Sequence, residues 1–310
     1  MTAELPTRKQ NITAILYSDE APTESKLIHL SDLNTEDMEF FKQAWLEADP
    51  ERHYQVISQL IHLSEVDFTL DFTAIFTFCL QATDATVRIK AIDGLELEEN
   101  YHSISPLTAI LKDDSSNEVR AAAATALGKF AMQGELGNLS PDYTDTAYKA
   151  LLEAIESNTE TTEVRRRALE SISPLNLPKV KDSIKEAYHS DDIKLKASSI
   201  YAMGRNCDLS WLTILMTELS SKEAEIRYEA VNSCSELGSG EAVPHLIKLV
   251  DDEDVQIQEA AIKALGEIGS ENAEQALRKL LQDSQERIRE TAKSALKELH
   301  FCEDPISLNL

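Results

Sequence analysis

Residues 254–269 read DVQIQEAAIKALGEIG, and the same order of residue types returns along most of the chain. Ile257, Ala261 and Leu265 are spaced by four residues, so they lie on one face of a helix. Each such helix begins with an aliphatic residue followed by Arg, Lys or Gln, and the last four intervals between these pairs are each 31 residues. A fixed period of this length predicts stacked helical hairpins. The pairs are Val87-Arg88, Val119-Arg120, Val164-Arg165, Leu195-Lys196, Ile226-Arg227, Ile257-Gln258 and Ile288-Arg289.

Two further positions of the repeat support helical packing. Counted from the aliphatic residue as position zero, position four carries a small residue and position eight an apolar residue or cysteine. The three positions form one apolar stripe, and the small residue lets a neighbouring helix approach closely. An acidic residue about three positions before zero is placed to cap the helix. A second apolar-patterned helix precedes each of these, at residues 36–46, 72–82, 105–111, 148–155, 177–188, 211–219, 241–250 and 273–281.

These patterns predict an all-α protein, a right-handed α-solenoid (superhelix) of about eight helical hairpins over residues 31–302. Residues 1–30 are expected to form an N-terminal arm with one capping helix, and residues 303–310 a loose tail. One interval, from Val119 to Val164, exceeds the period by 14 residues. The surplus falls at 133–145, QGELGNLSPDYTD, whose Gly, Pro and Asp content predicts a loop insertion. Such a loop is either a tolerated surface insertion or a binding loop.

The chain is strongly acidic, with a formal net charge of −25. Nucleic acid is therefore not expected as a partner, because binding to phosphates depends on Lys and Arg. No apolar run reaches the roughly 20 residues of a membrane span. Residues 1–10, MTAELPTRKQ, lack the apolar core of a signal peptide. We expect a cytoplasmic protein in which Cys79, Cys207 and Cys234 are buried.

The pattern D-x-x-V-R-x-x-A-x-x-x-L-G resembles HEAT repeats. It is more narrowly similar to the HEAT-like repeats first described in phycobilisome lyases and widespread in bacteria. Residues 117–130, NEVRAAAATALGKF, and 254–269 match it best, and the resemblance covers roughly residues 35–300. It implies an armadillo-like solenoid of bacterial type that binds a partner. It also implies an Asp–Arg ladder between neighbouring units, for which the candidates are Asp84, Arg88, Arg120, Arg165, Asp192, Lys196, Arg227, Asp254 and Arg289.

No catalytic, cofactor-binding or metal-binding set is evident from residue types and spacing. The acidic turns at 113–114, 191–192 and 251–254 lack the alternating ligands of a calcium loop, so we interpret them as helix caps. Deoxyhypusine hydroxylase, a diiron HEAT-repeat enzyme, carries His-Glu pairs on its repeats. None of the seven histidines of this chain is followed by Glu, which disfavours a metal-dependent hydroxylase. We expect no enzymatic activity, no cofactor and no metal.

The second helix of each hairpin is expected to line a concave surface, with positions two, three, six, seven and ten projecting from it. In the middle of the array these positions carry Arg and Tyr, the residue types enriched at binding hot spots. An alternative is that the charges form internal salt bridges, for example Arg167 with Glu170 or Arg205 with Glu229. The candidate partner-binding residues are Arg166, Arg167, Tyr201, Arg205, Tyr228, Glu229 and Asn232.

The sequence therefore favours a non-enzymatic scaffold or adaptor that binds a protein or peptide on its concave face. One alternative is a bilin-handling protein like the phycobilisome lyases, in which Arg would hold the propionates and Tyr would stack on the pyrroles. A second alternative is the disfavoured metal-dependent hydroxylase. The residues leave the identity of the partner and the oligomeric state open.

Overall fold

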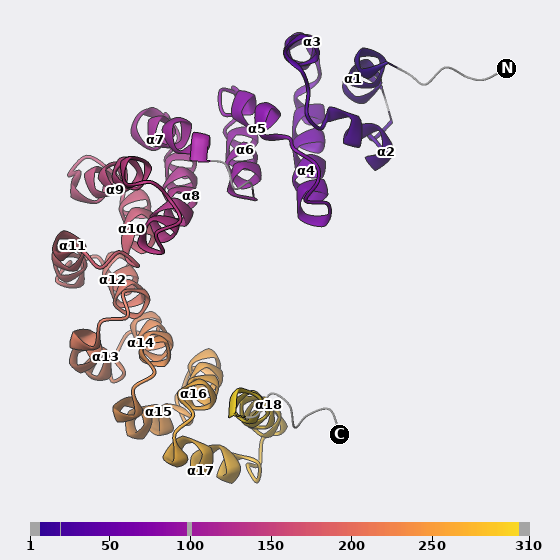
Figure 1. Ribbon diagram of the computed structural model, residues 1–310. Helices are drawn as coiled ribbons and strands as arrows, with labels where there is room; N and C mark the ends of the chain where they lie inside the picture. Colours follow the sequence, from indigo (N-terminus) through magenta and orange to yellow (C-terminus); the bar gives the residue numbers. More distant parts are fainter. Residues whose placement is uncertain (1–6, 19, 98–100, 304–310) are drawn as a thin grey trace. The chain divides into compact units, whose positions relative to one another are not determined.

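The computed structural model describes residues 7–18, 20–97 and 101–303, and in these ranges the chain forms eighteen α-helices and no strand (Figure 1). The all-α solenoid class is confirmed, because the helices follow one another as paired hairpins. The chain divides into two compact units, Met1–Ser171 and Ile172–Leu310. Each unit is described by itself.

The first unit holds four hairpins, each with an A helix followed by a B helix. Two short helices precede the hairpins and contact the first of them. The first three B helices also contact one another in chain order, which makes the core continuous between these hairpins. The helices are α1 (Arg8–Tyr17), α2 (Glu24–Leu27), α3 (Thr35–Glu47), α4 (Pro50–Val66), α5 (Thr73–Cys79), α6 (Ala85–Leu97), α7 (Ile104–Asp113), α8 (Asn117–Glu135), α9 (Pro141–Glu156) and α10 (Thr162–Ile172).

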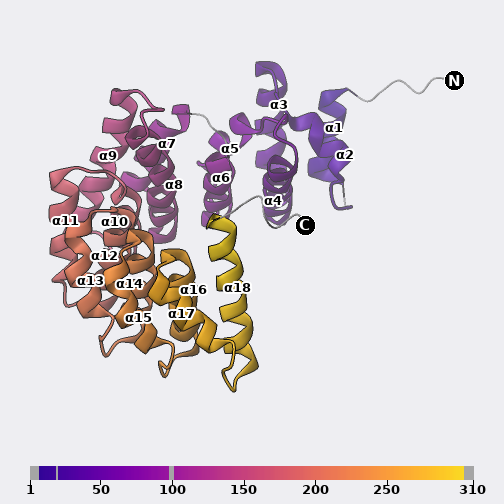
Figure 2. The same cartoon turned by 60° about the horizontal axis from the view of Figure 1, so that its bottom comes forward.

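The second unit holds four more hairpins, whose A helices form one row and whose B helices form another (Figure 1). Its B helices contact one another in chain order, and Figure 2 shows the last of them, α18, beside α16. The helices are α11 (Pro178–Tyr188), α12 (Ile193–Arg205), α13 (Leu212–Glu218), α14 (Ala224–Leu237), α15 (Val243–Leu249), α16 (Val255–Ile268), α17 (Glu271–Leu280) and α18 (Glu286–Glu303).

The repeat positions account for the core of each hairpin. The residues at positions zero and eight are buried, and every small residue at position four is fully excluded from solvent. A larger side chain at position four would hold the neighbouring helix away, so the small residues set the distance between helices. The position-four residues are Ala91, Ala123, Ala168, Ser199, Ala230, Ala261 and Ala292.

A glycine after position eight brings successive B helices into close contact. A Cβ atom on Gly204 would lie 2.7 Å from the Cα atom of Ser233, which is closer than real Cβ atoms approach. Gly128 and Gly266 meet Ser171 and Ala295 in the same way. In each pair the glycine faces the small residue at position seven of the next B helix. The Leu-Gly step of the repeat is therefore explained by helix packing.

In three hairpins the arginine after position zero links the hairpin to the following one. Arg88 donates from Nε and Nη2 to the two oxygens of Asp114, at 2.7 and 2.8 Å. Its Nη1 donates to the carbonyls of Ala82 and Thr83, in the turn of its own hairpin. Arg227 binds Asp252 through Nε and Nη2 at 2.8 and 2.9 Å, and its Nη1 binds two turn carbonyls as well. Each of these two guanidinium groups therefore binds the turn of its own hairpin and a carboxylate in the turn of the following hairpin.

Two hairpins vary this link. The partner of Arg120 is Glu160, 40 residues further along the chain, with both contacts at 2.8 Å. Lys196 stands where most other hairpins have Arg, and its Nζ lies 2.9 Å from Glu218. Glu218 also accepts a hydrogen bond from the hydroxyl of Tyr188. Burial and this hydrogen bond raise the pKa of Tyr188 to about 12.

The structure corrects the acidic half of the predicted ladder. Asp84, Asp192 and Asp254 accept backbone N–H groups at the first turns of α6, α12 and α16, so they act as helix N-caps. In the ladder pairs of Arg88, Arg120 and Arg227, the carboxylate belongs to a residue that precedes the N-cap of the following B helix. Arg165 donates to the carbonyl of Ile155, and Arg289 donates to two carbonyls of its own turn.

Acid is expected to weaken the ladder. Burial by itself would raise the pKa of Asp252, but the hydrogen bonds from Arg227 and from the Asp254 N–H outweigh it and lower the pKa. A lowered pKa in the folded state stabilises the protein above the unfolded value, near 4, and the gain is lost as the pH falls through the folded value. We therefore expect the difference in melting temperature between the wild type and Arg227→Met to be full at pH 6 and to shrink toward pH 3. A difference that stays constant over this range would contradict the assignment.

The predicted loop insertion at 133–145 is wrong. Helix α8 continues to Glu135 and α9 begins at Pro141, so most of the surplus lengthens two helices. Gly134, which suggested a turn, lies where α9 packs on α8, and a Cβ atom there would come within 2.2 Å of Thr144. Pro141 is tolerated because it occupies the first turn of α9, where its missing N–H would have no helical partner.

The predictions for the cysteines and for the two ends of the chain are confirmed only in part. Cys79 and Cys234 are buried, and burial raises the pKa of both thiols. Cys207 is exposed, which corrects the prediction for it, and it follows α12 with a φ of 54°. Residues 1–30 contribute α1 and α2 instead of one capping helix. Of the expected tail, residues 304–310 lie outside the described residues.

Candidate functional site

Two of the predicted binding residues line a groove in the second unit. Tyr228 and Asn232 on α14 face α16 across a groove with a volume of about 480 Å³. The Tyr228 ring is 38% exposed, and its hydroxyl has no hydrogen-bond partner among the described residues. The groove is also lined by Gln256, Glu259, Ala260, Lys263, Ala264 and Glu267 of α16.

The groove combines a small apolar floor with charges of both signs. Ala260 and Ala264 are buried and form the floor. Lys263 is exposed and makes no ion pair with a described residue. Glu259 is held by Arg287 of α18 at 3.1 Å, and Glu267 accepts a hydrogen bond from Ser235. The groove therefore offers an aromatic ring, an amide and an ammonium group beside an apolar surface.

The remaining candidates of the second unit lie on the same B helices. Tyr201 on α12 is 39% exposed and Glu229 on α14 is half-buried. Arg205 lies 3.5 Å from Glu236, so the predicted pairing with Glu229 is wrong. Arg205 and Glu236 both occupy position ten of their helices.

One repeat position recurs with polar or aromatic side chains on three successive B helices. Position six is Tyr201 on α12, Asn232 on α14 and Lys263 on α16, spaced by the 31-residue period. Asn232 and Lys263 line the same groove, and Tyr201 holds the equivalent position on α12, so we assign the three side chains to one row across the three helices. We call this row, together with Tyr228, the α12–α16 strip.

Arg166 and Arg167 belong to the first unit, on α10. Arg167 contacts Glu163 and Glu170 at 2.9 Å each, and Arg166 contacts Glu163 at 3.0 Å. The internal salt bridge of Arg167 with Glu170 is thus present. The cluster consists of four side chains of α10, and its two glutamates largely neutralise the charge of its two arginines.

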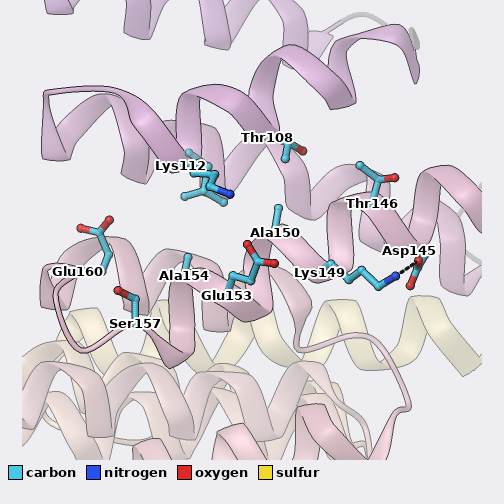
Figure 3. A pocket seen from close by; sticks show the side chains of 11 residues that line it. Thr108, Lys112, Asp145, Thr146, Lys149, Ala150, Glu153, Ala154, Ser157 and Glu160 are labelled. Atoms are coloured by element: carbon cyan, nitrogen blue, oxygen red, sulfur yellow. Dashed lines mark ion pairs between the residues drawn. The ribbon is translucent and has the colours of Figure 1, made fainter.

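The sequence did not point to a second recess, between the A helices α7 and α9 of the first unit. Its volume is about 440 Å³, and Thr108 and Lys112 extend from one side of it while Ala150, Glu153 and Ala154 extend from the other (Figure 3). The Thr108 hydroxyl is buried without a hydrogen-bond partner among the described residues. The only sequence signal for this recess was the surplus of 14 residues, which lengthens α9.

Metal-binding groups and membrane-spanning helices would define other kinds of site among residues 7–18, 20–97 and 101–303. In these ranges no group of three or more His, Cys, Asp or Glu side chains is arranged to hold a metal ion. Among the helices described, none is long and apolar enough to cross a bilayer.

Comparison with known proteins agrees with the hairpin architecture. The family model of HEAT repeats matches residues 74–141 and 209–297, which together make up half of the chain. The chain belongs to the HEAT-repeat family. No curated protein matches the sequence.

Several solved structures are similar in fold. The Escherichia coli protein YibA is 15% identical, with a TM-score of 0.49 over 82% of this chain and 97% of that one. The complex of CpcE and CpcF of phycocyanin lyase from Nostoc is 17% identical, with a TM-score of 0.47 over 73% and 94%. Human deoxyhypusine hydroxylase is 16% identical, with a TM-score of 0.36 over 94% and 97%. Similarity at this level carries no argument about function.

Proposed function

We propose that this protein is a non-enzymatic HEAT-repeat scaffold that binds a protein or peptide along the exposed faces of its B helices. The α12–α16 strip is the central contact. The observation that supports this proposal most directly is Tyr228, a large exposed ring with an unused hydroxyl beside a groove.

The composition of the strip favours a polypeptide as its occupant. A peptide that crosses the B helices meets one side chain of the position-six row on each helix, namely a ring, an amide and an ammonium group. An amide both donates and accepts hydrogen bonds, so Asn232 suits a peptide backbone. The groove volume is that of a site for a few side chains. Charges of both signs at its rim would set the register of the partner.

A photocrosslinking experiment tests this surface against a matched control. A photoreactive phenylalanine derivative replaces Tyr228 in one protein and Ile247 in another. Ile247 lies on the A helix α15 and is also 38% exposed, so the two probes are equally accessible. In an extract of the source organism, we expect a discrete partner to be captured from position 228 and not from position 247.

A substitution then measures how much the strip contributes to binding. With the partner so identified, Tyr228→Ala is expected to lower the affinity about tenfold or more, because Tyr is enriched among the few residues that contribute most to binding. Ile247→Ala should leave the affinity unchanged. Calorimetric titration of the purified pair gives both values. Equal capture from both positions, or an unchanged affinity for Tyr228→Ala, would reject the strip as the binding surface.

A further inference from the structure

Arg289 on α18 makes the same contacts to its own turn as the ladder arginines do. Its Nη1 donates to the carbonyls of Asp283 and Ser284, at 2.8 and 3.0 Å. Arg227 uses its Nη1 in the same way, on the carbonyls of Ser221 and Lys222. The turn carbonyls therefore fix the orientation of both guanidinium groups.

The Nε and Nη2 atoms of Arg289 bind no carboxylate of a described residue. In Arg88 and Arg227 the Nε and Nη2 atoms bind both oxygens of one carboxylate. Arg289 has no carboxylate partner among the described residues. Because its Nη1 is already held, the remaining two donors form a fork oriented for a carboxylate.

The neighbouring positions on α18 differ from those of the other B helices. Position five is a buried apolar residue in α12, α14 and α16, where it is Ile200, Val231 and Ile262. On α18 positions five and nine are Lys293 and Lys297, and both are exposed. A hairpin stacked on α18 as on the other B helices would bury two ammonium groups at large cost. This face of α18 is therefore not built for another hairpin of the same kind.

We infer that Arg289, Lys293 and Lys297 form a binding site for an acidic segment of a partner protein, with one carboxylate held in the Arg289 fork. The three residues are spaced by four, so they lie along one side of α18. Lys293 has a weak contact with Glu290 at 3.7 Å, and Lys297 has no ion pair with a described residue. In a chain with a net charge of −25, this basic row attracts an anionic segment locally. The site is separate from the α12–α16 strip.

A synthetic peptide that already fits such a fork provides the probe. Residues 249–260, LVDDEDVQIQEA, contain Asp252, which occupies the fork of Arg227. A fluorescein-labelled copy is titrated with the full chain at about 0.15 M salt, where long-range repulsion is screened. We expect Arg289→Gln to weaken binding about tenfold. Arg278→Gln, which removes the same charge from α17, should change it less than twofold.

Two further variants separate specific docking from other causes. Because Arg289→Gln also releases the turn carbonyls, the double variant Lys293→Gln plus Lys297→Gln is measured too, and it should weaken binding with the turn intact. An Asp→Asn change at the Asp252 position of the peptide should abolish the effect of Arg289→Gln, since the two groups act as a pair.

Three results would overturn the inference. They are an equal loss for Arg289→Gln and Arg278→Gln, peptide binding that appears only after removal of residues 304–310, and preferential binding to anionic lipid vesicles. The first shows non-specific charge attraction. The second shows that the chain's own segment fills the fork, and the third points to a membrane surface. None of them bears on the α12–α16 strip, so failure here is distinct from failure of the proposed function.

Discussion

Arg227→Met is expected to lower the free energy of unfolding of the second unit by about 3–5 kcal/mol, the cost of breaking a buried ion pair. Arg227 is 6% exposed and Asp252 is nearly as buried, so the carboxylate left behind could not be fully hydrated. The carbonyls of Ser221 and Lys222 would lose their donor as well. Methionine keeps the apolar stem, so the loss reports the charge and its hydrogen bonds.

The two tryptophans allow the measurement to be confined to one unit. Trp45 lies in the first unit and Trp211 in the second, and both are buried. In a Trp45→Phe background, the fluorescence of Trp211 during urea unfolding follows the second unit alone. The control is Arg278→Met, which removes an exposed pair with Glu274 and should cost less than about 1 kcal/mol. If the two variants lost similar stability, the ladder would have no special role.

Gly204→Val is expected to cost about 3 kcal/mol, at the upper end of overpacking effects. The first added carbon would already lie 2.7 Å from the Cα atom of Ser233, and a backbone atom has no rotamer by which to avoid it. Helices α12 and α14 would have to separate, which would weaken the contact between hairpins. Val is no worse than Gly as a helix former, so propensity does not explain such a loss.

A second glycine provides the control for this substitution. Gly240 has no heavy atom within 4 Å of an added Cβ and does not have a positive φ. Gly240→Val should therefore change stability by less than about 0.5 kcal/mol. The urea midpoint of the second unit gives both values. A similar shift for the two variants would mean that close packing at Gly204 is not limiting.

The helical hairpins could be predicted because their signal is local. Positions zero, four and eight lie within two turns of one helix, and burial of each position is decided by the immediate neighbours. All eight expected A helices are present, with boundaries that differ by a few residues, apart from α9. For that helix the prediction began at residue 148, whereas α9 begins at Pro141. Gly134 was read as a turn residue, although its role is to admit Thr144.

The partners of charged residues were harder to predict, because each depends on the distance between two hairpins. The sequence assigned Asp254 both to the helix cap and to the ladder, whereas Asp254 caps the helix and Asp252, two residues earlier, binds Arg227. Arg205 was predicted to pair with Glu229, whereas its carboxylate partner is Glu236 of α14. The exposed Tyr228 was predicted as a contact residue, and the groove beside it comes from the spacing of α14 and α16.

The short sequence distance within the ladder has a consequence for how the chain folds. Arg88 and Asp114 are 26 residues apart, and Arg227 and Asp252 are 25 apart. At a synthesis rate of about 5–20 residues per second, each carboxylate leaves the ribosome about 1–5 s after its arginine. A hairpin joined by such a pair can therefore close onto the previous one while later hairpins are still being made. Folding during translation, from the N-terminal hairpin onward, then needs no contact between distant parts of the sequence.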